Sequence, residues 1–503
     1  MGEWQDKLEA TLAGLERDAR HIDFRPQLQD LGRVQQIGDG VALVKGLDGA
    51  MIDEVVVFAN GVKGQVFDLD RDAVGCMLYG PEEGIHANSV VFRTGRPLFM
   101  PVGAAVLGRV VDAIGQPRDG LGPLHTSEER AVEQEAPGPL QRQPICEPLF
   151  TGVKVIDAAI PIGRGQRELI LGDRGTGKTS ITLDTIINQR ASGVVCIYVS
   201  IGKKRTSVVE VLEELREREA LGHTVIVVAD ASEPASLQYL APYAGCTLAE
   251  WFAYQGKHAL IIYDDLTRHA DAYRDLSLIL RHPPGREAYP GDIFSVHAKL
   301  IERAFKLSEG LGGGSVTALP IIETQRGNIA GFIPTNLISM TDGQLYLDAA
   351  LFAQGQFPAI DVGKSVSRVG RDAQPGAMQD AAANLRLDIA QYEEVRGFAR
   401  FGAILDEATK RQIARGERLA HVLAQRERDV VPLSVQVAEL WALKEGLLDD
   451  VPPAEIPAFE RQLLAVARDF THLEPQIRTT AAIDDPLASE LRSWVLQAKT
   501  VSE

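Results

Sequence analysis

The sequence predicts a multidomain protein with a small N-terminal β-barrel, a central α/β domain with a mainly parallel sheet, and a C-terminal α-helical bundle. Its 503 residues are enough for about three domains of ordinary size. Two changes of pattern divide the chain. Short β-rich runs give way near residue 95 to apolar strands that alternate with helices, and the strand signals fade after about residue 376.

The first 24 residues are predicted to form an N-terminal helix or extension. Apolar side chains recur there at helical spacing with charged residues between them, at Trp4, Leu8, Leu12 and Leu15. Such a helix either packs on its own protein or docks on a partner, and the sequence favours neither. The segment lacks the apolar run of a secretory signal.

Residues 25–94 predict the small β-barrel. Their strand-forming runs are short and separated by glycine-rich turns, which is typical of a small barrel or sandwich. The predicted strands are Arg33–Ile37, Val41–Val44, Glu54–Phe58, Val62–Asp68, Gly75–Leu78 and Ser89–Phe92.

Residues 95–376 predict the α/β domain, and residues 377–503 predict the bundle. Strands that are apolar throughout and alternate with helices are typical of a parallel sheet covered on both faces. The clearest strands are Glu168–Leu171, Val194–Val199, Thr224–Ala229 and Ala259–Tyr263. The predicted bundle helices are Arg386–Phe401, Asp406–Ala420, Leu433–Leu447 and Ala454–Phe470.

The composition argues against several functions. The formal charge is −17, from 52 basic and 69 acidic residues, so general nucleic-acid binding, which needs clustered Lys and Arg, is not expected. The apolar runs are far shorter than the roughly 20 residues of a membrane-spanning helix. The four cysteines are too widely spaced for a disulfide framework or a zinc site; they are Cys76, Cys146, Cys196 and Cys246.

A phosphate-binding loop is the strongest motif in the chain. The pattern GxxxxGK[ST] is matched by Gly172, Asp173, Arg174, Gly175, Thr176, Gly177, Lys178 and Thr179. The loop lies between a predicted strand and a predicted helix, Ser180–Arg190. Its glycines let backbone N–H groups turn toward phosphate oxygens, and the helix N-terminus favours anions. Lys178 is expected to reach the β and γ phosphates, so the loop predicts binding of ATP or ADP.

A second element of the same site is the apolar strand that ends in Asp264 and Asp265. Such an acid is the usual partner of a phosphate loop and holds Mg²⁺ directly or through water. We therefore expect a Mg²⁺ site formed by the Thr179 hydroxyl and a carboxylate, with Asp264 as the better candidate.

The sequence also indicates that this site does not catalyse hydrolysis efficiently. Hydrolysis needs a group that orients the attacking water, often a carboxylate or Gln. In RecA-like ATPases this group ends the strand after the loop helix, but here Val194–Val199 is followed by Ser200–Arg205, which contains no carboxylate. Lys203 cannot act as a base while it is protonated. The site is therefore expected to bind nucleotide without efficient turnover.

Several long motifs resemble, in order, the alpha subunit of F-type ATP synthases. They are Pro161–Leu169, Gln238–Gly245, Pro283–Asp292, Ala318–Thr324 and Ser365–Gly370. The resemblance covers about Leu31 to Leu447 and implies a β-barrel, a RecA-like P-loop domain and a helical bundle. It also implies that three such chains alternate with three catalytic beta subunits. The implied further partners are the central-stalk gamma subunit and peripheral-stalk subunits bound through the N-terminal region.

The resemblance implies a place and a role for the protein. The assembly would lie on the cytoplasmic face of the bacterial cell membrane and couple ATP synthesis or hydrolysis to H⁺ or Na⁺ translocation. In this family the alpha sites hold MgATP without catalysis. Arg368 matches the arginine that reaches the neighbouring beta site and stabilises γ-phosphate charge, and Ser365 matches a serine linked to activity. The adenine pocket is matched by Phe352, Pro358 and Gln425.

Four positions depart from the family pattern. Gly175 and Lys203 each stand where Gln is usual, Phe357 replaces an Arg, and Glu427 replaces a Gln. A lysine at position 203 could contact the γ-phosphate directly, whereas Gly175 loses a side-chain contact. These departures indicate a divergent or alternative complex.

Two other hypotheses compete with the alpha-subunit interpretation. A self-sufficient RecA-like hexameric ATPase, such as a secretion ATPase or a Rho-type helicase, needs a carboxylate after Val199 and, for RNA, a basic channel. A purely structural ring subunit would have no use for the intact Lys178, Thr179 and Asp264.

Overall fold

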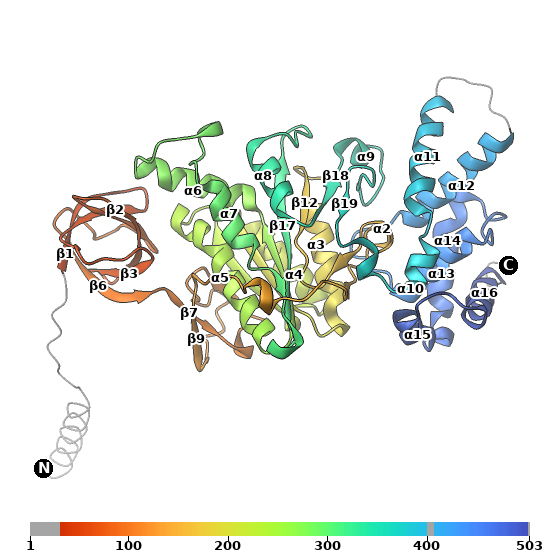
Figure 1. Cartoon of the computed structure of the whole chain (residues 1–503), viewed down its shortest axis with the longest axis horizontal. Coiled ribbons are helices and arrows are strands. Elements are labelled where there is room, and N and C mark those ends of the chain that lie inside the picture. The colour runs from red at the N-terminus through yellow and green to blue at the C-terminus, as the bar shows by residue number, and fades with distance from the viewer. Residues whose placement is uncertain (1–30, 400–406, 501–503) are drawn as a thin grey trace, which may run out of the picture.

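The computed structural model describes residues 31–399 and 407–500. The predicted N-terminal helix or extension, residues 1–24, lies outside the described residues. Three bodies follow one another along the long axis of the molecule: a barrel, a central sheet flanked by helices, and a helical bundle (Figure 1). The predicted multidomain fold class is confirmed.

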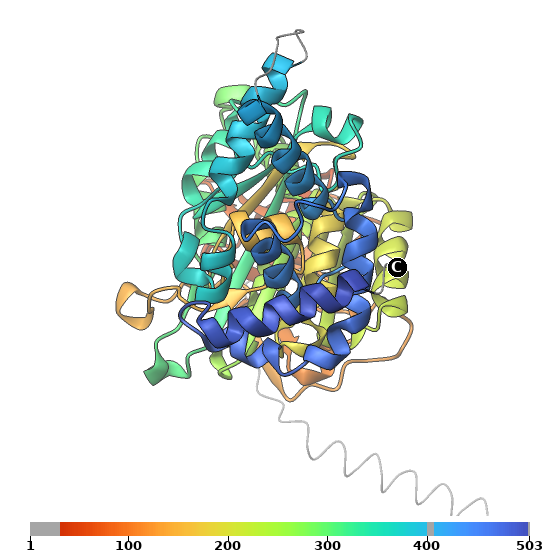
Figure 2. The same cartoon turned by 90° about the vertical axis from the view of Figure 1, so that its right-hand side faces the viewer.

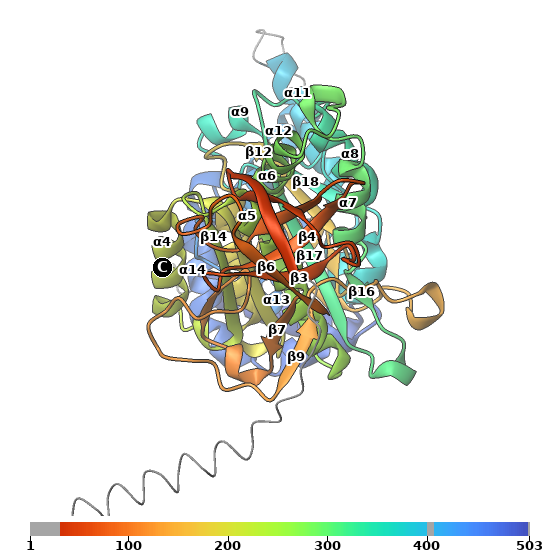
Figure 3. The same ribbon diagram turned by 90° about the vertical axis from the view of Figure 1, so that its left-hand side faces the viewer.

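The N-terminal body is a closed six-stranded barrel with the strand order β1-β2-β5-β4-β3-β6. Alternate side chains of its strands fill the interior, among them Val34, Phe58, Val66 and Leu78. Figure 3 shows the barrel in front of the central domain. Its strands are β1 (Leu31–Gly38), β2 (Val41–Lys45), β3 (Glu54–Phe58), β4 (Lys63–Leu69), β5 (Val74–Leu78) and β6 (Val90–Pro97).

The central body is built on a nine-stranded sheet in the order β19-β18-β12-β17-β15-β13-β14-β8, with β16 paired to β17. Strands β8 to β18 along this path run parallel, while β16 and β19 pair antiparallel. The strands are β8 (Val110–Asp112), β12 (Glu168–Asp173), β13 (Val195–Lys203), β14 (Thr224–Asp230), β15 (His258–Asp264), β16 (Phe305–Lys306), β17 (Ser315–Thr324), β18 (Gly343–Leu347) and β19 (Val366–Ser367).

Both faces of this sheet are buried, as the continuously apolar strands predict. Ile170 and Tyr198 pack on one face with α2 (Lys154–Ala159), α3 (Lys178–Asn188) and α4 (Arg205–Glu217). Their neighbours along the strands pack on the opposite face, because successive strand residues point to opposite sides. The helices there are α5 (Ala235–Tyr254), α6 (Leu266–Ile279), α7 (Ile293–Ile301) and α8 (Phe332–Met340).

Short elements complete the central body. The helix α9 (Ala349–Ala353) follows β18. Two small antiparallel sheets pair β7 (Phe99–Val102) with β9 (Glu128–Ala131), and β10 (Pro148–Leu149) with β11 (Ile162–Gly163).

The C-terminal body is helical and shares a continuous apolar core with the first face of the sheet. Figure 2 shows its helices facing the viewer. The first helix and the last two are additions to the four predicted from sequence, and Trp494 on the last one stacks on Phe470 with ring centroids 5.3 Å apart. The helices are α10 (Gly376–Ala381), α11 (Leu385–Ala399), α12 (Glu407–Leu423), α13 (Leu433–Lys444), α14 (Ile456–Val466), α15 (Leu473–Thr479) and α16 (Asp485–Thr500).

Within residues 31–399 and 407–500, no helix combines the length and the apolar character needed to cross a bilayer. The domain boundaries predicted at residues 24, 94 and 376 stay predictions.

Candidate functional site

The phosphate loop connects the carboxyl end of β12 to the first residue of α3. Gly177 is the N-cap of α3 and has a φ of +95°, a left-handed conformation that glycine adopts without strain. Gly172 has no room for a side chain, since a Cβ there would lie 2.6 Å from the Leu347 carbonyl oxygen. The glycines therefore allow the loop to turn tightly before the helix, as the motif predicts.

Side chains within the loop hold its backbone in place. The Thr176 hydroxyl donates to the Asp173 carbonyl at 2.8 Å. The Asp173 carboxylate accepts from the Thr324 hydroxyl at 2.7 Å and from the Gly327 N–H at 2.8 Å. Two of the predicted loop residues, Asp173 and Thr176, thus brace the loop, while Arg174 and Gly175 are exposed at its tip.

Lys178 is buried and folds over the loop it belongs to. Its ammonium donates to the Gly172 carbonyl at 2.8 Å and to the Asp173 carbonyl at 2.6 Å. Burial lowers the pKa of Lys178, against the attraction of Glu323, Asp265 and Asp264.

The two predicted metal-binding residues lie together. The Thr179 hydroxyl donates to Asp264 Oδ2 at 2.9 Å, and the Tyr198 hydroxyl donates to the same oxygen at 2.6 Å. Asp265 is also buried and caps α6 by accepting from the Arg268 N–H at 2.9 Å. Burial raises the pKa of Asp265 to about 6, with a contribution from the neighbouring carboxylate.

Lys203, the last residue of β13, enters the same site. Its ammonium lies 2.6 Å from Asp264 Oδ1 and 3.6 Å from Asp265 Oδ2. Burial alone would lower the pKa of Lys203, but the two carboxylates outweigh it and the pKa is raised. The residue that stands in place of a catalytic carboxylate is therefore a cation bound to the acids of the site.

These groups open onto a cleft of about 590 Å³. Its lining includes loop residues, Lys203, Lys204, Phe352 and Glu323. Sequence reasoning missed Glu323, although it is the last residue but one of the central strand β17 and pairs in register with Gly172. The available signal was the Ala318–Thr324 motif, because the carboxyl ends of parallel strands meet at one edge of the sheet, where ligands bind.

The three predicted adenine-pocket residues line one small hollow beside the cleft, together with Phe357. Phe352 and Phe357 meet edge to face with centroids 5.1 Å apart. The side-chain amide of Gln425 donates both of its hydrogens to backbone carbonyls, those of Gly152 at 2.7 Å and Asp429 at 2.6 Å. Gln425 can therefore shape this hollow, but it has no amide hydrogen left for a ligand.

Ser365 and Arg368 flank β19 and are not part of the phosphate loop itself. Ser365 is fully buried; its hydroxyl accepts from the Tyr346 N–H at 2.9 Å and donates to the Asp361 carbonyl at 2.6 Å. Ser365 thus fixes the segment that leads to Arg368. The Arg368 side chain is exposed and its guanidinium donates to the Thr341 carbonyl at 3.2 Å.

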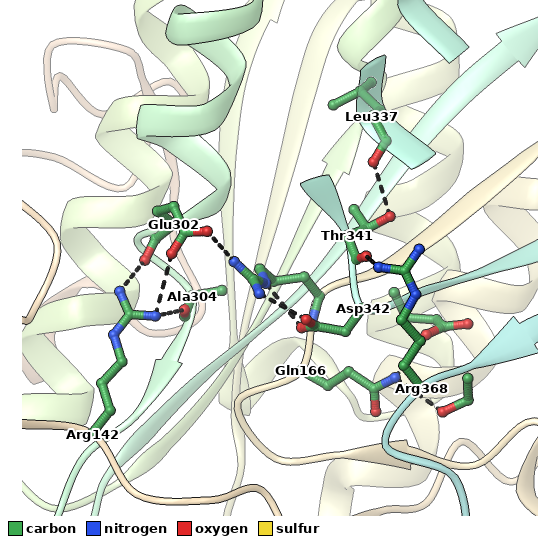
Figure 4. A network of polar contacts seen from close by, with 11 residues as sticks. Arg142, Gln166, Glu302, Ala304, Leu337, Thr341, Asp342 and Arg368 are labelled. Carbon is green, nitrogen blue, oxygen red and sulfur yellow. Dashed lines mark hydrogen bonds and ion pairs between the residues drawn. The ribbon is translucent and has the colours of Figure 1, made fainter. Parts of the chain in front are cut away.

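A polar network surrounds the base of Arg368 (Figure 4). The Arg368 N–H donates to the Asp342 carbonyl at 2.8 Å. The Asp342 carboxylate receives a two-pronged contact from Arg167, at 2.9 and 2.7 Å. Arg167 also pairs with Glu302, which lies 3.5 Å from Arg142. The backbone of Arg368 is therefore anchored while its side-chain tip stays accessible.

A buried carboxyl lies beneath this network at the start of β12. Gln166 donates to Glu168 Oε2 at 2.8 Å and to the Ser367 hydroxyl at 3.1 Å. Glu168 is fully buried, and this burial raises its pKa well above the usual value, although the charge of Arg368 favours ionisation.

Arg368 and the phosphate loop occupy opposite ends of the sheet, whereas Ser365 contacts Tyr346, which pairs with Leu171 near the loop. Glu168 pairs with Gly343 at the amino ends of β12 and β18, next to Arg368, and the phosphate loop begins at the carboxyl end of β12. The six residues of β12 separate these ends by roughly 17 Å at 3.3 Å per residue. Arg368 therefore points away from its own chain's phosphate loop.

Family models match the protein along most of its length. The models are the ATP synthase alpha/beta family, beta-barrel domain over 27–95, the ATP synthase alpha/beta family, nucleotide-binding domain over 152–367, and the ATP synthase alpha/beta chain, C-terminal domain over 374–498. The order of the three domains agrees with the barrel, sheet and helical bodies of the structure. The protein thus belongs to the ATP synthase alpha/beta family and is an alpha- or beta-type subunit of a rotary ATPase.

Proposed function

We propose that the protein is the alpha-type subunit of a rotary F-type ATP synthase: a non-catalytic, regulatory, nucleotide-binding subunit. It supplies Arg368 to the site of a neighbouring beta subunit during ATP synthesis or hydrolysis coupled to H⁺ or Na⁺ translocation. Its partners are three beta subunits in an alternating ring, the central-stalk gamma subunit and peripheral-stalk subunits. The complex is attached peripherally to the cytoplasmic face of the cell membrane.

The observation that carries the proposal is the identity and contacts of Lys203. A catalytic P-loop site needs a group that orients water at the end of the strand following the loop helix. That strand is β13, and its last residue is a lysine whose ammonium lies 2.6 Å from Asp264. A protonated amine accepts no proton, so the nucleotide bound here serves structure or regulation.

The position of Arg368 supports its role in a neighbouring site. The side chain is exposed at the amino end of the sheet, and its backbone is anchored through Asp342. An arginine in this arrangement can contact a second chain, but it cannot reach the phosphates of a nucleotide bound to its own chain. An arginine finger supplied in trans contributes roughly 10³–10⁵ to the rate in other NTPases.

The test compares the purified subunit with its complex with the beta-type subunit. We expect the subunit alone to bind ATP and to hydrolyse it at least about 10³-fold more slowly than the complex, because it lacks a catalytic base. Binding is followed by ATP-dependent thermal stabilisation, and hydrolysis by phosphate release. Comparable turnover by the subunit alone would refute the non-catalytic role.

One observation favours a second candidate, the self-sufficient ATPase. Glu323 lines the cleft and pairs in register with Gly172. If the isolated subunit turns over ATP, Glu323→Gln should abolish that activity, whereas the alpha-type role predicts no intrinsic activity for this substitution to remove.

A further inference from the structure

The structure allows a test of whether the predicted Mg²⁺ ligands fit a divalent cation. Asp264 Oδ2 already accepts from two hydroxyls, those of Thr179 and Tyr198. Only Asp264 Oδ1 remains for a metal ion or a metal-bound water. The ammonium of Lys203 lies 2.6 Å from that atom, so a cation already holds the position.

Two ammonium groups already face the carboxylates near this position, and Glu323 adds a third carboxylate there. Asp264 and Asp265 are both about 1 % exposed, and the Lys203 ammonium lies within 4 Å of each carboxylate. The buried Lys178 ammonium lies at the same site, held by the Gly172 and Asp173 carbonyls. A divalent cation added between Thr179 and Asp264 would meet an ammonium at close range, and like charges at such distances repel strongly in a partly buried site.

The surrounding cleft is suited to a polyanion that brings no cation with it. Five basic side chains line it against three acidic ones; the basic set is Arg174, Lys178, Lys203, Lys204 and Arg268, and the acidic set is Asp265, Glu323 and Glu427. In most phosphate-loop sites the metal ion bridges phosphate oxygens and neutralises their charge. Here the Lys203 ammonium at the end of β13 faces the space that the metal ion would occupy, and it is positively charged like the metal ion.

We propose that Lys203 is a built-in cation that replaces the divalent metal, so that this subunit binds nucleoside triphosphate without Mg²⁺. The inference rests on the nucleotide binding of the proposed function and changes its cofactor requirement. It follows that Thr179 and Asp264 position the Lys203 ammonium instead of a metal ion.

Isothermal titration of the purified full-length protein with ATP tests the proposal, once in excess EDTA and once in excess Mg²⁺. For the wild type, we expect dissociation constants that agree within about threefold, less than 1 kcal/mol. Lys203→Gln removes the cation and frees Asp264 Oδ1, so its binding should become at least about tenfold tighter in Mg²⁺ than in EDTA. Lys203→Met, a variant of similar length, should behave in the same way.

A matched control removes the same charge from the same cleft. Lys204 is exposed, lines the cleft and, within the described residues, makes no ion pair with Asp264 or Asp265. Lys204→Gln should therefore weaken ATP binding by the same factor in EDTA and in Mg²⁺. Melting curves recorded without nucleotide establish that each variant is folded.

Three outcomes would overturn the inference, and they differ from one another. A wild-type protein that loses tenfold or more of its ATP affinity in EDTA requires the metal. Variants at position 203 that stay independent of Mg²⁺ would show that Lys203 is not the replacing cation. Failure of the wild-type protein to bind ATP under either condition would also overturn the nucleotide-binding part of the proposed function.

Discussion

The charged side chains at the two ends of β12 differ in their exposure to solvent. At the carboxyl end, Lys178, Asp264 and Asp265 are buried around a cleft, and the Lys203 ammonium pairs with the Asp264 carboxylate there. At the amino end, the guanidinium of Arg368 is exposed and donates to a backbone carbonyl. One strand thus connects two different kinds of site. The nucleotide site at its carboxyl end is formed by this subunit alone, whereas Arg368, in the proposed role, acts only in the site of another subunit.

The two ends also differ in what their ion pairs contribute. The Arg167–Asp342 pair is about one-fifth exposed and Glu302 is half exposed. Partly solvated pairs add little to stability, on the order of 0–1 kcal/mol each. Their effect is geometric, because they fix the backbone from which Arg368 projects. At the carboxyl end, by contrast, removing one charge leaves another buried and unpaired, which costs more.

The largest effect is expected at the amino end. Arg368→Ala should lower ATP hydrolysis by the assembled complex by about 10³-fold or more, because it removes positive charge from the transition state in the neighbouring site. The isolated variant should bind ATP as the isolated wild type does, since the nucleotide cleft lies at the other end of the strand. Steady-state hydrolysis and ATP titration measure the two properties.

Arg371→Ala is the matched control for Arg368. Arg371 is an exposed arginine in the same segment and donates to the Ala383 carbonyl at 3.3 Å. Its loss should leave hydrolysis by the complex within about twofold of wild type, as for a surface substitution. Equal losses from both variants would mean that the segment, and not the Arg368 guanidinium, is what matters.

A smaller effect is expected at the carboxyl end, on ATP binding by the subunit and not on hydrolysis by the complex. Lys178→Ala should remove the ATP-dependent stabilisation of the isolated subunit, worth about 4 kcal/mol at a ligand concentration 1,000 times the dissociation constant. Hydrolysis by the complex should stay within about tenfold of wild type, because catalysis occurs in the neighbouring site. Thermal unfolding with and without ATP provides the first measurement.

Arg190→Ala serves as the comparison for Lys178. Arg190 follows the same helix, its side chain is 60 % exposed, and it pairs with the exposed Glu219. ATP should stabilise this variant as it stabilises the wild type. If Lys178→Ala abolished hydrolysis by the complex as fully as Arg368→Ala, the proposed division of roles between the two ends would be wrong.

The smallest effect concerns the buried carboxyl of Glu168, whose pKa is raised by burial above the usual 4.5. In the unfolded protein this group loses its proton near pH 4.5, while the folded protein retains it to higher pH. Stability therefore falls as pH rises above that point. Glu168→Gln keeps an acceptor for Gln166 and removes the titration, so it should melt a few degrees higher than wild type at pH 8. The difference should shrink at pH 5.

Melting curves at the two pH values decide this prediction. A difference between Glu168→Gln and wild type that is the same at pH 5 and pH 8 would show that Glu168 does not stay protonated in the folded protein. Hydrolysis by the complex should change little in this variant, because Gln166, Asp342 and the backbone of Arg368 keep their contacts.

Much of the fold was predictable because its signals are local. The six barrel strands confirm the six predicted runs, and the observed β12 to β15 overlap the predicted apolar strands. The phosphate loop needed only its own eight residues and their neighbours. β17, by contrast, was recognised only within a motif and not as a strand, and Glu323 near its end was missed. Unlike the continuously apolar β12 to β15, β17 contains Pro320 and several polar residues, and a proline argues against a central strand.

The sequence by itself determined the order of the domains, the nucleotide loop and the substitution of Lys203 for a carboxylate. These depend on residue type and short-range pattern, which are present whatever the surroundings of each segment. Only the tertiary structure decided that Lys203 meets Asp264 and that Arg368 stands at the far end of β12 from the loop. Parallel pairing brings strand ends distant in the sequence to one edge, and packing of both sheet faces fixes which residues meet there.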